Sequence, residues 1–85
     1  GNFHLSYLFM PDDHEARAKA EELNVKMVQR ALRLEGTCTG EHGIGLHKMG
    51  YLLDEAGPTA VAMMRDIKRA LDPKNILNPG KMFAL

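Results

Sequence analysis

The sequence lacks an excess of charge of either sign. Its 85 residues carry 11 Lys+Arg and 11 Asp+Glu, so the formal net charge is zero. A protein that binds nucleic acid or a membrane surface by bulk electrostatics needs basic side chains in excess to pair with phosphates. The balanced charge therefore argues against such partners, and we expect no nucleic acid to bind.

Long apolar runs, tryptophan and a second cysteine are also lacking. No apolar run approaches the roughly 20 residues that span a bilayer, and no leader of charged, apolar and then small residues opens the chain. The single cysteine, Cys38, excludes an internal disulfide and fits a reducing compartment, so we expect a cytoplasmic location and a buried, structural thiol. With six Met, three Phe and two Tyr, the core has few rigid aromatic side chains.

The composition is that of a globular chain, with 45% hydrophobic and 26% charged residues. A chain of 85 residues makes one small domain or a piece of a larger one. Because the first residue is Gly rather than Met, we expect either a processed N-terminus or a fragment of a larger protein.

Two segments have the pattern of strands. Over residues 3–10, the side chains of Phe3, Leu5, Tyr7 and Phe9 alternate with those of the intervening positions, which predicts a strand. The short, β-branched stretch 37–39 predicts a second strand.

Three helices are expected between and after these segments. The first covers residues 13–35, with Asp12 as its N-cap and Gly36 in the left-handed conformation that ends it. Its apolar stripe is Ala16, Ala20, Leu23, Met27, Ala31 and Leu34, at steps of 3 and 4.

The second helix covers residues 46–55, and Gly57-Pro58 separates it from a third helix. That helix has an inner stripe of Ala60, Met64, Ile67 and Leu71 and ends at Asp72-Pro73. After it, Asn78-Pro79-Gly80 predicts a type II turn.

Together these elements predict an α+β fold, a few-stranded antiparallel sheet with helices packed on one face. Two strands make a poor sheet alone. Either the domain forms a homo-oligomer through its strands, or further strands precede Gly1.

Residues 40–45, G-E-H-G-I-G, are the stretch with the most chemistry. They are not a phosphate-binding loop, because Leu46-His47 stand where Lys-Ser/Thr must follow. A carboxylate and an imidazole are common ligands of zinc, manganese or ferrous iron. In an extended chain the adjacent side chains of Glu41 and His42 point different ways, so one can bind a metal while the other faces a substrate, and two ligands alone are too few for a tight site. The residues also allow plainer readings: a buried His4 bonded to backbone, and a purely conformational turn at 40–45.

Residues 36–45, G-T-C-T-G-E-H-G-I-G, closely resemble the C-terminal part of FAD-linked 2-hydroxy-acid dehydrogenases of the vanillyl-alcohol-oxidase flavoprotein superfamily. Residues 71–81 resemble the closing signature of that family, L-D-P-x-x-x-x-N-P-G-K, and residues 1–4 resemble the end of its H-x-G-D-G-N-x-H element. The cytochrome-linked D-lactate dehydrogenase type is most similar, followed by the flavin subunit of glycolate oxidase.

The resemblance implies that residues 1–85 are the C-terminal fragment of a substrate, or cap, domain of ferredoxin-like fold. It places the domain that binds the FAD pyrophosphate before residue 1. By the same resemblance, His4 and Glu41 are ligands of a divalent metal such as zinc or manganese. His42 is the general base, and Gly43 and Asn78 lie near the flavin.

The activity that this family implies is oxidation of a D-2-hydroxy acid, of the D-lactate or glycolate type, to the 2-oxo acid with hydride transfer to FAD. The partners are then the small substrate and the rest of the flavoenzyme, which in its intact form is cytoplasmic or peripheral to a membrane. We expect the fragment alone to be inactive. The alternative is a non-catalytic metal-binding or dimerisation module.

Overall fold

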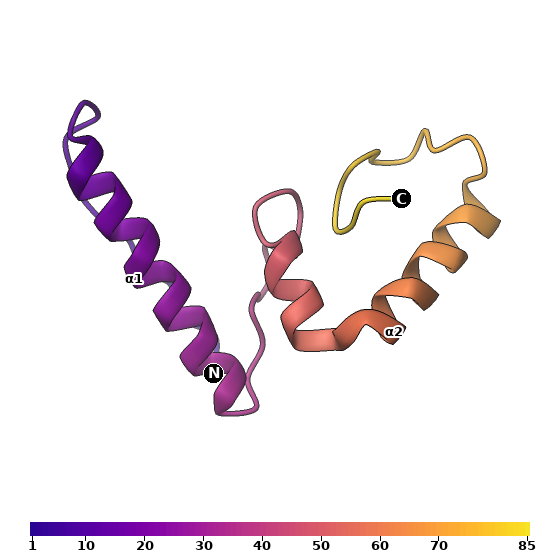
Figure 1. Ribbon diagram of the computed structural model, residues 1–85, viewed down its shortest axis with the longest axis horizontal. Coiled ribbons are helices and arrows are strands. Elements are labelled where there is room, and N and C mark those ends of the chain that lie inside the picture. The colour runs from indigo at the N-terminus through magenta and orange to yellow at the C-terminus, as the bar shows by residue number, and fades with distance from the viewer. The chain divides into compact units, whose positions relative to one another are not determined.

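The computed structural model describes all 85 residues and contains two helices, α1 (His14–Arg33) and α2 (Met49–Leu71), as Figure 1 shows. The chain divides into two units, residues 1–36 and residues 37–85, and each contains one of the helices. Neither helix is long and apolar enough to cross a membrane.

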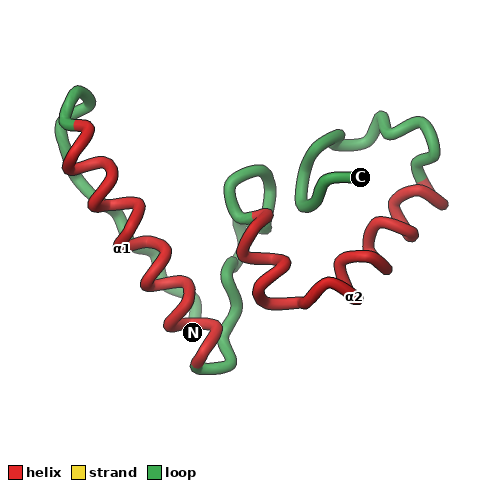
Figure 2. The backbone as a smooth tube through the Cα atoms, in the orientation of Figure 1, coloured by secondary structure: helices red, strands yellow, loops and turns green.

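The predicted α+β fold with an antiparallel sheet is wrong, because no residue lies in a strand and every connection in Figure 2 is a loop. Alternation over residues 3–10 indicates an extended backbone with side chains on two sides. A strand also needs a second strand with which to exchange ladder hydrogen bonds, and no second strand is formed. Residues 37–39 bond instead to side chains of their own unit.

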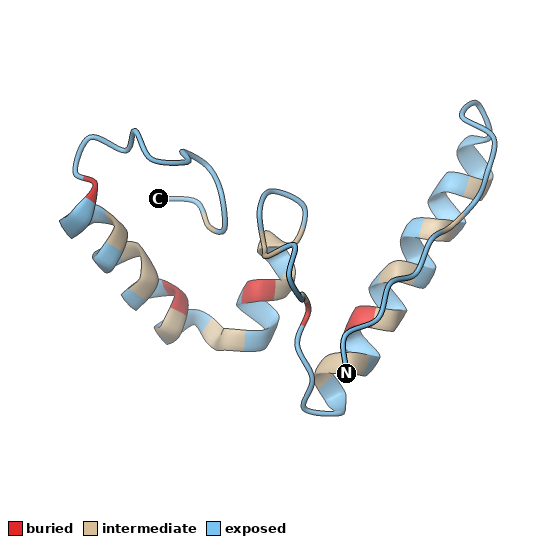
Figure 3. Ribbon diagram, turned by 180° about the vertical axis from the view of Figure 1, so that it is seen from behind, coloured by how far each residue is buried: buried red, intermediate tan, exposed pale blue.

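In the first unit, the N-terminal segment runs alongside α1 and joins it through a turn (Figures 1 and 3). The N–H of Asp13 donates to the carbonyl of Met10 at 3.0 Å and closes this turn. Val28 is the buried residue of α1, and most of the predicted apolar stripe is half-buried around it. Leu23 and Leu34 lie on that stripe but are exposed, so the covered face is narrower than the sequence predicted.

The N-cap of α1 is Asp13, one residue after the predicted Asp12. The Asp13 carboxylate accepts from the Ala16 N–H at 2.9 Å, which satisfies one of the amides that a helix start leaves without a partner.

The C-terminal end of α1 has the two hydrogen bonds of a Schellman motif. Glu35 N–H donates to Leu32 O at 3.1 Å, and Gly36 N–H donates to Ala31 O at 2.9 Å. The left-handed residue is Glu35, with φ of 60°, so its assignment to Gly36 was wrong. Gly36 is required for another reason: a Cβ there would lie 3.0 Å from the Ala31 carbonyl oxygen.

In the second unit, α2 consists of two helical halves that meet at a kink. Gly57 has φ of 80° and ψ of 165°, and Pro58 opens the second half. The predicted break at Gly57-Pro58 is thus confirmed. The buried residues of this unit are Cys38, Leu52, Val61 and Asp72, and Figure 3 shows buried positions, in red, on both halves of α2.

The predicted inner stripe of the second half is only partly correct. Ala60 and Met64 are half-buried, but Ile67 and Leu71 are 53% and 78% exposed. The covered face is turned toward Val61, Arg65 and Lys68, because the two cations bond to the chain that follows the helix.

The end of α2 follows the sequence prediction. The helix ends at Leu71 with Asp72 as its C-cap, directly before Pro73. The turn at Asn78-Pro79-Gly80 is also confirmed, since Lys81 N–H donates to Asn78 O at 3.3 Å and Gly80 has the positive φ, 71°, of a type II turn.

Candidate functional site

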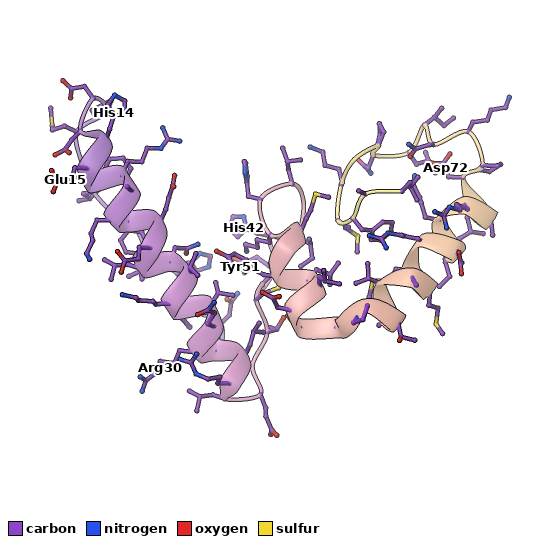
Figure 4. The ribbon with its side chains drawn as sticks, viewed as in Figure 1. His14, Glu15, Arg30, His42, Tyr51 and Asp72 are labelled. Carbon is purple, nitrogen blue, oxygen red and sulfur yellow. The ribbon has the colours of Figure 1, made fainter.

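Glu41 and His42 lie on a tight turn that precedes α2, where Figure 4 labels His42. Gly43 N–H donates to Gly40 O at 3.1 Å, and Gly43 takes a φ of 72° that favours glycine. The Glu41 and His42 side chains are 56% and 72% exposed, and Glu41 Oε1 lies 3.7 Å from His42 Nε2. The turn therefore brings the carboxylate and the imidazole together, which the extended backbone assumed from the sequence would not allow.

Two side chains that the sequence analysis missed support this turn from inside the unit. Lys48 Nζ donates to Thr39 Oγ1 at 2.9 Å, and Thr39 Oγ1 donates to Gly43 O at 2.6 Å. Both side chains belong to half-buried residues. A hydroxyl and a cation at either end of a glycine-rich loop are the signal that could have identified them.

The segment before the turn is fixed to the first half of α2 by Glu55. Its Oε2 atom accepts from Cys38 N–H at 2.8 Å and from Thr37 Oγ1 at 3.1 Å. The amide hydrogen bond from Cys38 is the main reason that the pKa of Glu55 is lowered. These bonds replace the strand ladder that the β-branched sequence predicted.

The Cys38 thiol is buried, as the sequence predicted. Burial, and then the neighbouring Glu55 carboxylate, raise the pKa of Cys38 to about 11. The thiol is thus neutral at physiological pH, which fits a structural role and not that of a nucleophile.

The chain after α2 folds around the carboxylate of Asp72, which Figure 4 labels at the end of this helix. Asp72 accepts from the N–H groups of Ile76 and Leu77, at 3.1 and 2.9 Å, and from Lys68 Nζ. Lys68 also donates to the Leu77 carbonyl. The ion pair with Lys68, followed by the backbone amides, lowers the pKa of Asp72.

The C-terminal residues then return to the glycine-rich loop. Met82 N–H donates to Gly45 O at 2.8 Å, and Arg65 Nε donates to Ala84 O at 2.6 Å. Gly45 ends the G-E-H-G-I-G loop, and Met82 directly follows N-P-G-K. This hydrogen bond therefore links two motifs that are more than 30 residues apart in the sequence.

The site residues predicted from the sequence fall in three places. Glu41, His42 and Gly43 share one turn, and Asn78 begins the turn that leads to Met82. His4 lies in the N-terminal segment of the first unit. In the second unit, the carboxylate oxygens and imidazole nitrogens of Glu41 and His42 are donor types that zinc and manganese accept, so their chemistry fits a divalent cation.

Comparison with known proteins identifies the family. Residues 1–82 match the model of the FAD linked oxidases, C-terminal domain. The chain is 52% identical over 83 residues to a mitochondrial D-lactate dehydrogenase (cytochrome) of Arabidopsis thaliana, covering 98% of this chain and 15% of that protein.

Two relatives with other substrates in their names are also similar. The glycolate oxidase subunit GlcD of Bacillus subtilis is 38% identical over 84 residues, covering 99% of this chain and 18% of that protein. A D-2-hydroxyglutarate dehydrogenase of Xanthomonas citri is 38% identical over 85 residues, covering 98% of this chain and 18% of that protein. The chain thus spans less than a fifth of the length of these relatives.

The match over residues 1–82 confirms the resemblance found in the three sequence motifs. The members of this family are FAD-linked oxidoreductases, and the sequence of this chain corresponds to their C-terminal domain. The chain belongs to the FAD-linked oxidases, as part of their C-terminal domain.

Proposed function

We propose that this chain supplies part of the substrate site of an FAD-dependent enzyme that oxidises a D-2-hydroxy acid to the 2-oxo acid. The observation that carries the proposal is the Glu41-His42 turn, an exposed carboxylate and imidazole side by side in a chain of this family. The names of the relatives, D-lactate dehydrogenase, glycolate oxidase and D-2-hydroxyglutarate dehydrogenase, share the 2-hydroxy acid as substrate class.

In this proposal His42 is the general base. Oxidation of an alcohol carbon removes a hydride from the carbon and a proton from the hydroxyl, and a neutral imidazole takes that proton. Bound FAD would supply the hydride acceptor. The exposed position of the His42 ring leaves it open to a small substrate.

Glu41 and His4 are the proposed ligands of a divalent cation such as zinc or manganese. A carboxylate and an imidazole suit either ion. When bound, the cation would polarise the hydroxyl and carboxylate of the substrate. Gly43 and Asn78 are the proposed neighbours of the flavin, and both take the positive φ of tight turns.

The proposed partners are the substrate and the rest of the flavoenzyme. A homo-oligomer remains a prediction, and so does a cytoplasmic location. The Arabidopsis relative is named as a mitochondrial protein.

The base is tested in the full-length flavoprotein that contains this region. We expect His42→Ala to lower kcat by about 100-fold or more, the typical share of a general base, with FAD still bound. His47→Ala is the matched control, because His47 is an exposed histidine of the same loop. Stopped-flow reduction of the flavin by D-lactate and by glycolate is the measurement, and normal turnover of His42→Ala would refute the base assignment.

The metal ligands are tested separately by elemental analysis. His4→Ala and Glu41→Gln should each lower the metal content of the purified flavoprotein, while the exposed His14 provides the control variant His14→Ala. An unchanged metal-to-protein ratio in the first two variants would refute their assignment as ligands.

A further inference from the structure

We infer that Thr39 and Lys48 are positioning residues that hold the Glu41-His42 turn. They do so through a chain of two hydrogen bonds, from Lys48 to Thr39 and from Thr39 to the Gly43 carbonyl. The inference rests on the proposed function for its catalytic consequence, but the chain of contacts itself is a property of the second unit. Lys48 bonds to Thr39, and Thr39 bonds to the Gly43 carbonyl, so both residues act on the turn through that carbonyl.

The direction of this chain follows from the donors and acceptors. A lysine ammonium has three donors and no acceptor, so in the 2.9 Å contact Lys48 Nζ donates and Thr39 Oγ1 accepts. The hydroxyl proton is then directed to the Gly43 carbonyl at 2.6 Å. A charged donor at the head of the chain strengthens both bonds, because each polarises the next.

The hydrogen bonds from Lys48 and Thr39 give the Glu41-His42 turn a second closure. Residues 40–43 are already linked by the bond from Gly43 N–H to Gly40 O. The Thr39 hydroxyl adds a second link across the same residues, from the position before the turn to its last carbonyl. Glu41 and His42 are the two residues between these anchors. Because Thr39 and Lys48 are half-buried, water competes with their hydrogen bonds less than it would at an exposed site.

The neighbouring threonine provides a matched control. Thr37 also bonds through its hydroxyl, which donates to Glu55 at 3.1 Å and accepts from the Thr39 N–H at 3.5 Å, but neither bond belongs to the chain from Lys48 to Gly43. Thr37→Val therefore removes a hydroxyl of the same segment without cutting the chain from Lys48 to Gly43. Thr39→Val removes the link at nearly constant volume, and Thr39→Ser keeps the hydroxyl.

Kinetics of the full-length flavoprotein separate positioning from binding. A misplaced base lowers the rate of the chemical step, and geometric errors of about 1 Å can cost up to about 100-fold. We expect Thr39→Val to lower kcat about 10- to 100-fold and to change KM less than about twofold. Thr39→Ser and Thr37→Val should stay near the unmodified enzyme, and Lys48→Met should lower kcat in the same direction as Thr39→Val.

A measurement that does not use activity keeps the inference distinct from the proposed function. Amide hydrogen exchange over residues 40–45 should be about 10-fold faster in Thr39→Val, and in Lys48→Met, than in Thr39→Ser, as expected for loss of about 1.4 kcal/mol of local stability. If an enzyme without activity toward 2-hydroxy acids shows this difference, the positioning chain stands and the proposed function fails. An active enzyme in which Thr39→Val matches Thr39→Ser in kcat and in exchange overturns the inference alone. If Thr39→Val does not fold, Lys48→Met is compared with the unmodified protein in kcat and in amide exchange. Equal values in both measurements would then overturn the inference.

Discussion

Cys38 shows how two neighbours set the chemistry of one side chain. Cys38 is 7% exposed, and its thiol lies beside the Glu55 carboxylate, which also accepts a hydrogen bond from the Cys38 amide. Burial and the negative charge both favour the neutral thiol, so its pKa rises to about 11. A cysteine of this kind reacts only as the small fraction of thiolate allows.

The first prediction concerns the rate at which Cys38 is alkylated. Near about pH 8 a pKa of about 11 lowers the thiolate fraction on the order of 100-fold below that of a free cysteine, so iodoacetamide should modify native Cys38 on the order of 100-fold more slowly. Mass spectrometry of the Cys38 peptide measures the rate. The same protein unfolded in urea should regain the normal rate, and equal rates in both states would contradict the prediction.

At the residue scale, the sequence analysis identified the Glu41-His42 pair but not the side chains that hold its turn. The adjacency of Glu41 and His42, flanked by glycines, is visible in the sequence, and the structure places both on one turn. The only sequence signal for Thr39 and Lys48 is their place at either end of the glycine-rich loop, and they become partners only when the loop between them closes. Asp72 was predicted only as a helix end, yet its carboxylate also fixes the chain that follows.

At the scale of elements, α1 is set mainly by local signals. Its start and end differ from the sequence prediction by at most two residues, because capping side chains and helix-forming residues act within a few positions. Two adjacent aspartates precede the helix, and only the folded structure decides that Asp13 is the one that bonds to Ala16.

The second prediction compares these two aspartates. Loss of an N-cap costs about 1 kcal/mol of helix stability, so Asp13→Ala should lower the helix content of a peptide of residues 10–36. Asp12→Ala should change it little, by less than about 0.5 kcal/mol. Far-UV circular dichroism measures both. A larger loss with Asp12→Ala than with Asp13→Ala would restore the cap predicted from the sequence.

The third prediction concerns the kink in α2. The backbone angles of Gly57 lie in a region that is accessible almost only to glycine. Gly57→Ala should therefore destabilise α2 by about 1–3 kcal/mol, even though no atom lies within 4 Å of the added Cβ. Faster amide exchange on both halves of α2, measured in the full-length protein, is the expected result.

Gly50 is the matched control within the same helix. Its Cβ would also meet open space, but its φ is not positive. Gly50→Ala should leave exchange unchanged or slow it, because alanine is favoured over glycine in helices by about 0.5–1 kcal/mol. If both variants behave alike, the kink does not depend on the conformation of Gly57.

On the scale of the whole molecule, little of the apolar surface is buried. The buried hydrophobic residues are Val28, Cys38, Leu52 and Val61, and no side chain is less than 2% exposed. Large side chains such as Leu8, Leu71 and Ile76 are mostly exposed. Since burial of apolar surface is the main favourable term in folding, this chain by itself has little to offset its conformational entropy.

The fourth prediction follows from this small core. The 85-residue chain on its own should unfold without a sharp cooperative transition and should bind the dye ANS, as loosely packed states do. Calorimetry and ANS fluorescence of the chain test this. A single sharp heat-absorption peak with no dye binding would contradict the prediction.

The sequence by itself determined the helices, their break at Gly57-Pro58, the turn at Asn78-Pro79-Gly80 and the membership in the FAD-linked oxidases. The helices, the break and the turn depend on residues that are close together in the chain. The family membership depends on short motifs that can be recognised in the sequence itself. Only the tertiary structure decided that residues 3–10 and 37–39 form no sheet, that the covered face of α2 includes Arg65 and Lys68, and that Met82 bonds to Gly45. The physical reason is that a hydrogen bond or a buried face requires a specific partner, and here the partners lie far apart in the sequence.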